Sequence, residues 1–243
     1  LASNHKTTMK IVNSIRNNIP NAITCCNLLS GALACIAAFH AFEPWWWGRQ
    51  GYEVAFVLIA AAAVFDFFDG FAARLLHAVS PLGKELDSLS DAVSFGLAPA
   101  MVLYNMLVAK APHAEWLAYM AMLIPAFGAL RLAKFNVSTN QTTTFTGLPI
   151  PANAIFWIGF TNFYVEHHAD MPLWVVAVAV VALSLLMVCG LRMFSLKLHN
   201  LSLKENYKQY LLVVAFVAFV ALCGISGLAW AMLFYIALSA VTK

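Results

Sequence analysis

The sequence predicts an all-α, polytopic membrane protein with about eight transmembrane helices. Of its 243 residues, 62% are hydrophobic and only 10% are charged, whereas soluble domains carry about a quarter charged residues. The apolar residues gather in runs of about 20, the length that a helix needs to cross a bilayer. A β-barrel would instead show short segments of alternating polarity, so the spanning elements are expected to be helices.

Each apolar run gives one expected helix. The last two runs are short, and the segment Cys223–Gly227 ("CGISG") between them predicts the tight turn of a tilted helical hairpin. The eight expected spans cover residues 22–42, 54–76, 88–109, 114–134, 150–166, 172–192, 208–223 and 226–241.

The distribution of basic residues predicts the orientation, because cytoplasmic loops are enriched in Lys and Arg. Twelve of the 14 basic residues fall on one side of the expected spans, and only Arg49 and Lys110 fall on the other. Both termini are therefore expected in the cytoplasm, in the cytoplasmic membrane of a prokaryote. Residues 1–21 are expected to carry a juxtamembrane amphipathic helix that ends where Pro20 starts the first span, and Met9 is the expected natural start.

Four aspartates stand out in this apolar chain: Asp66, Asp69, Asp87 and Asp91. Asp66 follows twelve consecutive apolar residues, which places it about 18 Å along its helix. A lone carboxylate inside the bilayer costs about 2.5–3.5 kcal/mol on insertion scales. Since Arg74 and Lys84 are the basic residues near them in the sequence, bound divalent cations are the natural way to neutralise four acids.

The spacing of the aspartates supports a metal site. Asp66 and Asp69 lie three positions apart, and Asp87 and Asp91 lie four apart, so each pair shares one helix face. Ser80, Pro81 and Gly83 lie between the pairs, in a connection that turns the chain and sets the two faces together. Carboxylates are hard ligands that suit Mg²⁺, Ca²⁺ or Mn²⁺, and four of them are sufficient for one or two ions.

Small residues interrupt the same stretch at Gly70, Ala73, Gly83 and Gly96. Gly70 directly follows Asp69, so it removes a side chain where a ligand would approach the helix backbone. Simple packing between helices explains small residues equally well. The spacing by itself leaves both interpretations open.

These residues together resemble the signature of the CDP-alcohol phosphotransferase family. The matching pattern is Asp66-x-x-Asp69-Gly70-x-x-Ala73-Arg74, eight residues, then Gly83-x-x-x-Asp87-x-x-x-Asp91. The resemblance implies a six-helix catalytic core, expected at residues 22–192, followed by a linker and a transmembrane hairpin at residues 193–243. It also implies an enzyme that displaces CMP from a CDP-linked lipid with the hydroxyl of an alcohol.

The resemblance further implies a role for each motif residue. Asp66, Asp69, Asp87 and Asp91 would bind two divalent ions, Mg²⁺ or Mn²⁺, and Asp91 would also be the catalytic general base. Gly70, Ala73 and Gly83 would leave room for the nucleotide beside Asp69, and Arg74 would face phosphate or pair with a motif aspartate. A homodimer is common in the family, and no nucleic-acid partner is expected.

Three further segments resemble the phosphatidylserine synthase branch of that family: residues 86–100, 131–137 and 145–154. The expected substrates are therefore CDP-diacylglycerol and L-serine, within membrane lipids. Serine carries a carboxylate, and a guanidinium binds a carboxylate through two parallel hydrogen bonds. Arg131 is the candidate for this contact, with Asn136 as a possible helper; a basic residue that meets lipid phosphates at a helix end is the alternative for Arg131.

Other functions stay open at this point. The same chemistry could use glycerol 3-phosphate, inositol phosphate or choline as the acceptor, or an archaeal CDP-lipid as the donor. Carboxylates inside a membrane also mark ion pathways, but here all four lie on two helices, and no second half of the chain suggests an inverted repeat. The uncharged polar segment Ser138–Pro149 is expected to be a loop or a lid over the substrate.

Overall fold

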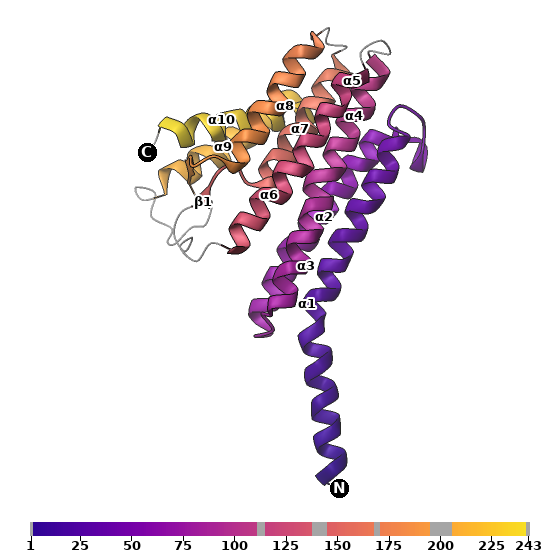
Figure 1. Ribbon diagram of the computed structural model, residues 1–243, viewed down its shortest axis with the longest axis vertical. Coiled ribbons are helices and arrows are strands. Elements are labelled where there is room, and N and C mark those ends of the chain that lie inside the picture. The colour runs from indigo at the N-terminus through magenta and orange to yellow at the C-terminus, as the bar shows by residue number, and fades with distance from the viewer. Residues whose placement is uncertain (1, 111–114, 138–144, 168–170, 195–205, 242–243) are drawn as a thin grey trace.

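The computed structural model describes residues 2–110, 115–137, 145–167, 171–194 and 206–241 (Figure 1). Helices make up most of these residues, which confirms the predicted all-α class. The described residues also form two strands of two residues each, β1 (Phe145–Thr146) and β2 (Arg192–Met193). They pair antiparallel, with Phe145 opposite Met193, and they were not predicted from the sequence.

The N-terminal part of the chain forms three long helical segments that lie side by side. They consist of α1 (Ala2–Phe39), η1 (Trp46–Gly48), α2 (Gly51–Leu75), α3 (Pro81–Asp91), the π-helical turn η2 (Ala92–Leu97) and α4 (Ala98–Lys110). The helix from Pro81 to Lys110 is continuous, so it begins seven residues before the expected span at residue 88. Because α3 begins at Pro81, the non-helical connection between the two aspartate pairs covers only residues 76–80.

The C-terminal part adds the remaining helices. They are α5 (Glu115–Ala118), η3 (Tyr119–Met122), α6 (Leu123–Val137), α7 (Ile150–Glu166), α8 (Leu173–Val188), α9 (Tyr207–Cys223), η4 (Gly224–Ser226) and α10 (Gly227–Val241). The predicted hairpin turn at Cys223–Gly227 is confirmed, because α9 ends at Cys223 and α10 begins at Gly227. In Figure 1 this hairpin runs at a wide angle to the other helices.

Each expected span coincides with a helical segment. Within the described residues, five segments are long and apolar enough to cross a membrane by length and composition: 16–39, 51–75, 81–110, 115–137 and 207–241. The helix α8 is apolar but shorter, with 16 residues. The integral membrane character is thus supported, and the count of eight spans stays a prediction.

The expected boundary at Pro20 is wrong. Pro20 lies inside α1, which continues without a break from Ala2 to Phe39, and Figure 1 shows the N-terminal part of this helix extending beyond the bundle. Proline removes one backbone donor from a helix interior and commonly breaks or kinks it. Here the helical path persists, and Thr24 Oγ1 donates to the Pro20 carbonyl at 3.0 Å.

The core includes fully buried large side chains from α4, α7 and α8, among them Leu103, Trp157 and Met187. Close helix approach depends on small residues. A Cβ added at Gly96 would lie 3.2 Å from the Cα of Pro125 on α6. The packing interpretation is therefore right for Gly96, and this contact holds η2 against α6.

Candidate functional site

A five-residue turn from Leu76 to Ser80 sets the two aspartate pairs together. At the end of α2, Ala78 N–H donates to the Ala73 carbonyl at 2.9 Å, and His77 adopts a φ of 51°, the left-handed conformation that closes many helix C-termini. Ser80 then caps α3 by accepting from Gly83 N–H at 3.0 Å, and Pro81 occupies the first turn, where its missing N–H costs nothing. The predicted turn at Ser80-Pro81 therefore leads directly into α3, with Ser80 as its N-cap.

The turn brings three of the four aspartates into one cluster. Carboxylate oxygens of Asp66, Asp69 and Asp87 lie within 4.8 Å of one another. Asp69 is only 5% exposed, and its Oδ2 has no hydrogen-bond partner among the described residues. A buried oxygen without a donor is costly, so this donor set fits divalent cations, which take carboxylate oxygens as ligands.

Asp91 completes the cluster from one helical turn further along. It is 8% exposed and lies within electrostatic range of the other three aspartates, with Asp66 in contact. Asn27 on α1 donates from Nδ2 to Asp91 Oδ1 at 3.4 Å. Asn27 Oδ1 in turn accepts from Ser94 Oγ at 2.6 Å, so the orientation of Asp91 is fixed from α1.

A cavity of about 270 Å³ opens beside the aspartates, between α1, α2 and α3. It contains every residue that was predicted to contact the nucleotide and diphosphate. Its lining includes Asp69, Gly70, Ala73, Arg74, Gly83 and Asp87, together with Asn21, Thr24 and Lys84. The structure therefore places two carboxylates, basic side chains and a small-residue wall around one space.

The glycines of the motif differ in what surrounds them. A Cβ added at Gly70 would meet nothing within 4 Å, so no neighbouring helix requires a glycine there. At Gly83 the nearest atoms are Asn21 Oδ1 at 3.1 Å and Ser80 Oγ at 3.2 Å. The open space at Gly70 lies in the cavity, which favours the ligand-approach interpretation for this residue.

Among the described residues, no Lys or Arg forms an ion pair with a motif aspartate. The ion pairs found among the described residues join His40 to Glu43 and Arg49 to Glu53, and neither involves a motif aspartate. Lys84 donates instead to the Asn136 carbonyl at 3.2 Å. Arg74 lines the cavity without an ion pair to an aspartate in the described part of the chain, so of its two predicted roles the phosphate contact remains.

The two residues predicted to bind the acceptor lie on α6 in different surroundings. Arg131 interacts electrostatically with Asp91 and with Tyr235 of α10, and its Nε is buried without a hydrogen-bond partner among the described residues. Asn136 donates from Nδ2 to Ser88 Oγ at 3.0 Å and to Glu85 Oε2 at 3.3 Å. Asn136 therefore connects α6 to α3, whereas Arg131 lies within electrostatic range of Asp91.

Sequence reasoning missed the contribution of α1. Thr24 lies beside Asp69, and Asn27 is fully buried with its amide on Asp91. A polar residue inside an apolar run was the available signal, since buried amides are usually hydrogen-bonded. The partner could not be read from the sequence, because it is 64 positions away. The segment Ser138–Pro149 lies largely outside the described residues.

Comparison with known proteins agrees with the geometry. Residues 17–166 match the family model described as CDP-alcohol phosphatidyltransferase. A CDP-diacylglycerol--serine O-phosphatidyltransferase of Mycobacterium bovis is 34% identical over 205 residues, covering 81% of this chain and 67% of that protein. The protein of the same name from Helicobacter pylori is 31% identical over 205 residues, with 83% and 80% covered.

An archaeal protein extends the comparison. The archaetidylserine synthase of Methanothermobacter thermautotrophicus is 33% identical over 177 residues, covering 71% of this chain and 68% of its own length. The matched residues of the family model contain all four aspartates, the cavity lining and the α1 residues that contact them. The resemblance found in the motif is confirmed: this chain belongs to the CDP-alcohol phosphatidyltransferase family.

Proposed function

We propose that the chain transfers the phosphatidyl group of CDP-diacylglycerol to the hydroxyl of L-serine, forming phosphatidylserine and releasing CMP. The observation that carries this proposal is the cluster of four carboxylates beside the cavity that contains Arg74, Gly70 and Gly83. The choice of serine rests on the bacterial relatives that are named for it. The active site would face the cytoplasm, with both termini on the same side.

Asp66, Asp69, Asp87 and Asp91 would hold two divalent ions, Mg²⁺ or Mn²⁺. The close approach of the oxygens of Asp66, Asp69 and Asp87 and the unpartnered Oδ2 of Asp69 support this assignment, because a cation would neutralise carboxylates that form no ion pair with a described side chain. When bound, such ions neutralise the charge that builds on a diphosphate leaving group. Arg74 would add a fixed positive charge at the same wall of the cavity.

Asp91 would act as the general base. In the proposed reaction the serine oxygen forms a bond to the lipid-linked phosphorus, the bond from this phosphorus to the CMP oxygen breaks, and the hydroxyl proton passes to Asp91. Because Asn27 occupies Oδ1 of Asp91, Oδ2 is the oxygen that remains for the proton. A general base must lie within hydrogen-bond reach of the hydroxyl, and Asn27 fixes this carboxylate in position.

Arg131 would bind the serine carboxylate. Its buried, unpartnered Nε and its position near Asp91 would bring the carboxylate of a bound serine close to the base that receives the hydroxyl proton. Asn136 is the weaker candidate for a contact with serine, because its amide nitrogen already donates to Glu85 and Ser88 of α3. Its Oδ1 is buried without a described partner and is the atom by which it would assist.

The acceptor is tested by supplying purified protein with CDP-diacylglycerol, Mg²⁺ or Mn²⁺, and a panel of alcohols while CMP release is measured. The panel contains L-serine, glycerol 3-phosphate, inositol phosphate and choline. Serine is expected to give the highest rate; CMP release with another alcohol but not with serine would overturn the assignment. The archaeal relative justifies repeating the assay with an ether-linked CDP-lipid.

A further inference from the structure

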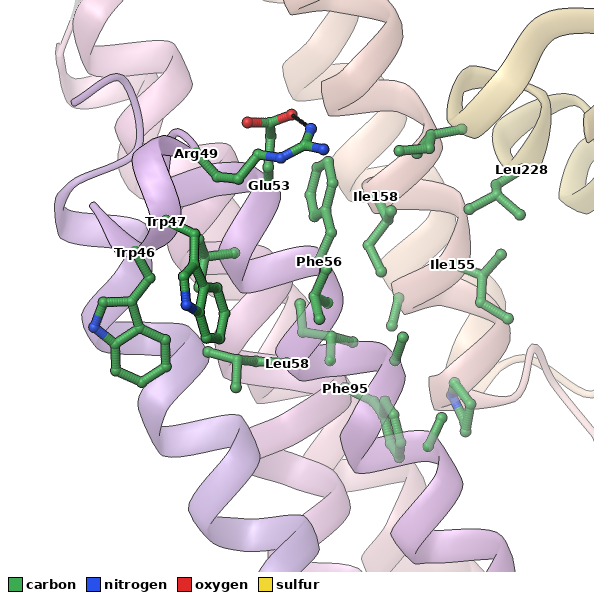
Figure 2. Close-up of a pocket in the computed structure, with 18 of the residues that line it drawn as sticks. Trp46, Trp47, Arg49, Glu53, Phe56, Leu58, Phe95, Ile155, Ile158 and Leu228 are labelled. Atoms are coloured by element: carbon green, nitrogen blue, oxygen red, sulfur yellow. Dashed lines mark hydrogen bonds and ion pairs between the residues drawn. The ribbon is translucent and has the colours of Figure 1, made fainter. Parts of the chain in front are cut away.

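A second cavity, of about 780 Å³, lies along the part of α2 that precedes the aspartates, residues 53–63. It is formed mainly by α2, α7 and the part of the α9–α10 hairpin around its turn, and Figure 2 shows its lining. Small side chains at Ala60, Ala63 and Ala154 create its depth between the larger Phe56 and Ile158. The cavity is an open, mostly apolar groove, and Val57 in its lining is 66% exposed.

One end of this groove approaches the aspartate cluster. Ala63 lies three positions before Asp66, and Phe95 lies four positions after Asp91. Residues with these separations share a helix face, so the groove and the aspartates follow the same faces of α2 and of the α3–η2 helix. A molecule held by its diphosphate at the aspartates would have its apolar part directed into the groove.

An ion pair marks the other end of the groove. Arg49 Nη1 lies 3.1 Å from Glu53 Oε1, and Figure 2 shows this ion pair next to Phe56, at the end of the groove opposite to Phe95. The ten positions from Glu53 to Ala63 correspond to about 15 Å along α2, about half of the ~30 Å hydrocarbon core of a bilayer.

We infer that this groove holds one acyl chain of the CDP-linked lipid and that Phe56 and the Arg49–Glu53 pair limit the length of that chain. This inference rests on the proposed function. Apart from the ion pair and the indole N–H groups of Trp46 and Trp47, the side chains of the lining are apolar, which suits a hydrocarbon chain. Methylenes added beyond Phe56 would have to displace water from two charged groups, which is unfavourable.

The test measures kcat/KM for CMP release with serine and a series of CDP-diacylglycerols that differ in acyl-chain length. Ala63→Phe fills the groove and is expected to lower the ratio of long-chain to short-chain kcat/KM by about tenfold, within the range by which a changed apolar pocket discriminates. Val64→Phe is the matched control, because Val64 is 53% exposed and does not line the groove. The control should keep the wild-type ratio.

A variant that enlarges the groove distinguishes a changed chain-length preference from a folding defect. Phe56→Leu is expected to shift the preferred substrate to longer chains, a gain that unfolding cannot produce. An unchanged chain-length profile in both Ala63→Phe and Phe56→Leu would overturn the inference, as would equal shifts in Ala63→Phe and Val64→Phe. If the wild-type protein releases no CMP with serine at any chain length, the proposed function fails instead, and the two failures are distinguishable.

Discussion

Gly70→Ala is expected to weaken nucleotide binding while leaving the fold as stable as before, or more stable. A Cβ at Gly70 would meet no atom within 4 Å, so the added methyl group enters the cavity and does not press on a helix. Glycine inside a helix costs about 1 kcal/mol relative to alanine. The free energy of unfolding should therefore rise by up to about 1 kcal/mol.

The loss of affinity follows from the size of the cavity. With about 270 Å³ to hold the nucleotide, an added methyl group beside Asp69 removes space that the ligand is proposed to fill. Overpacking a well-filled site costs about 1–3 kcal/mol, which corresponds to about 5–150-fold in the dissociation constant. Stability and affinity should thus move in opposite directions.

Calorimetric titration of CDP-diacylglycerol and thermal unfolding in the same detergent measure the two quantities. Gly96→Ala is the matched control, since its Cβ would lie 3.2 Å from Pro125 Cα and should lower the unfolding temperature through crowding between η2 and α6. The reasoning is refuted if Gly70→Ala binds the lipid with wild-type affinity, or if it loses thermal stability as Gly96→Ala does.

Three other predictions concern the chemistry. Asp91→Asn should lower kcat by about 10²–10⁴-fold while lipid binding stays measurable by titration, whereas Asp69→Asn should impair both; near-normal turnover in Asp91→Asn would exclude the general-base role. Arg131→Ala should raise the KM for serine far more than the KM for the lipid in steady-state assays, and equal effects would indicate a structural role. Removing divalent ions with a chelator should abolish CMP release, and added Mg²⁺ or Mn²⁺ should restore it; activity that persists in the chelator would contradict a metal-dependent reaction.

The parts of the fold that were predictable depend on local sequence. Long apolar runs specify helices because a chain in lipid must satisfy its backbone hydrogen bonds internally, and each expected span coincides with a helix. The turn before α3 was readable from Ser80 and Pro81, a helix cap and a first-turn residue. The faces shared by the two aspartate pairs followed from spacing alone, and the structure brings Asp66, Asp69 and Asp87 together as expected.

The parts that were not predictable depend on contacts between distant segments. Pro20 was expected to start the first span after a separate juxtamembrane helix, yet α1 is continuous through it. Asn27 contacts a residue 64 positions away, which no local pattern indicates. The lipid-facing groove arises from alanines on α2 and α7, and alanines in apolar helices are too common to mark a cavity.

The π-helical turn η2 connects the aspartates, α1 and the groove. A π-turn places one extra residue in a helical turn and frequently occurs at functional sites, and here it begins directly after Asp91. Three consecutive residues of this turn contact different parts of the structure. Ser94 donates to Asn27, Phe95 lines the groove, and Gly96 packs against α6. Any change that restored a regular α-helix after Asp91 would rotate these three side chains relative to Asp91, the proposed general base. The orientation of the proposed base and one end of the proposed acyl-chain groove therefore depend on the same turn.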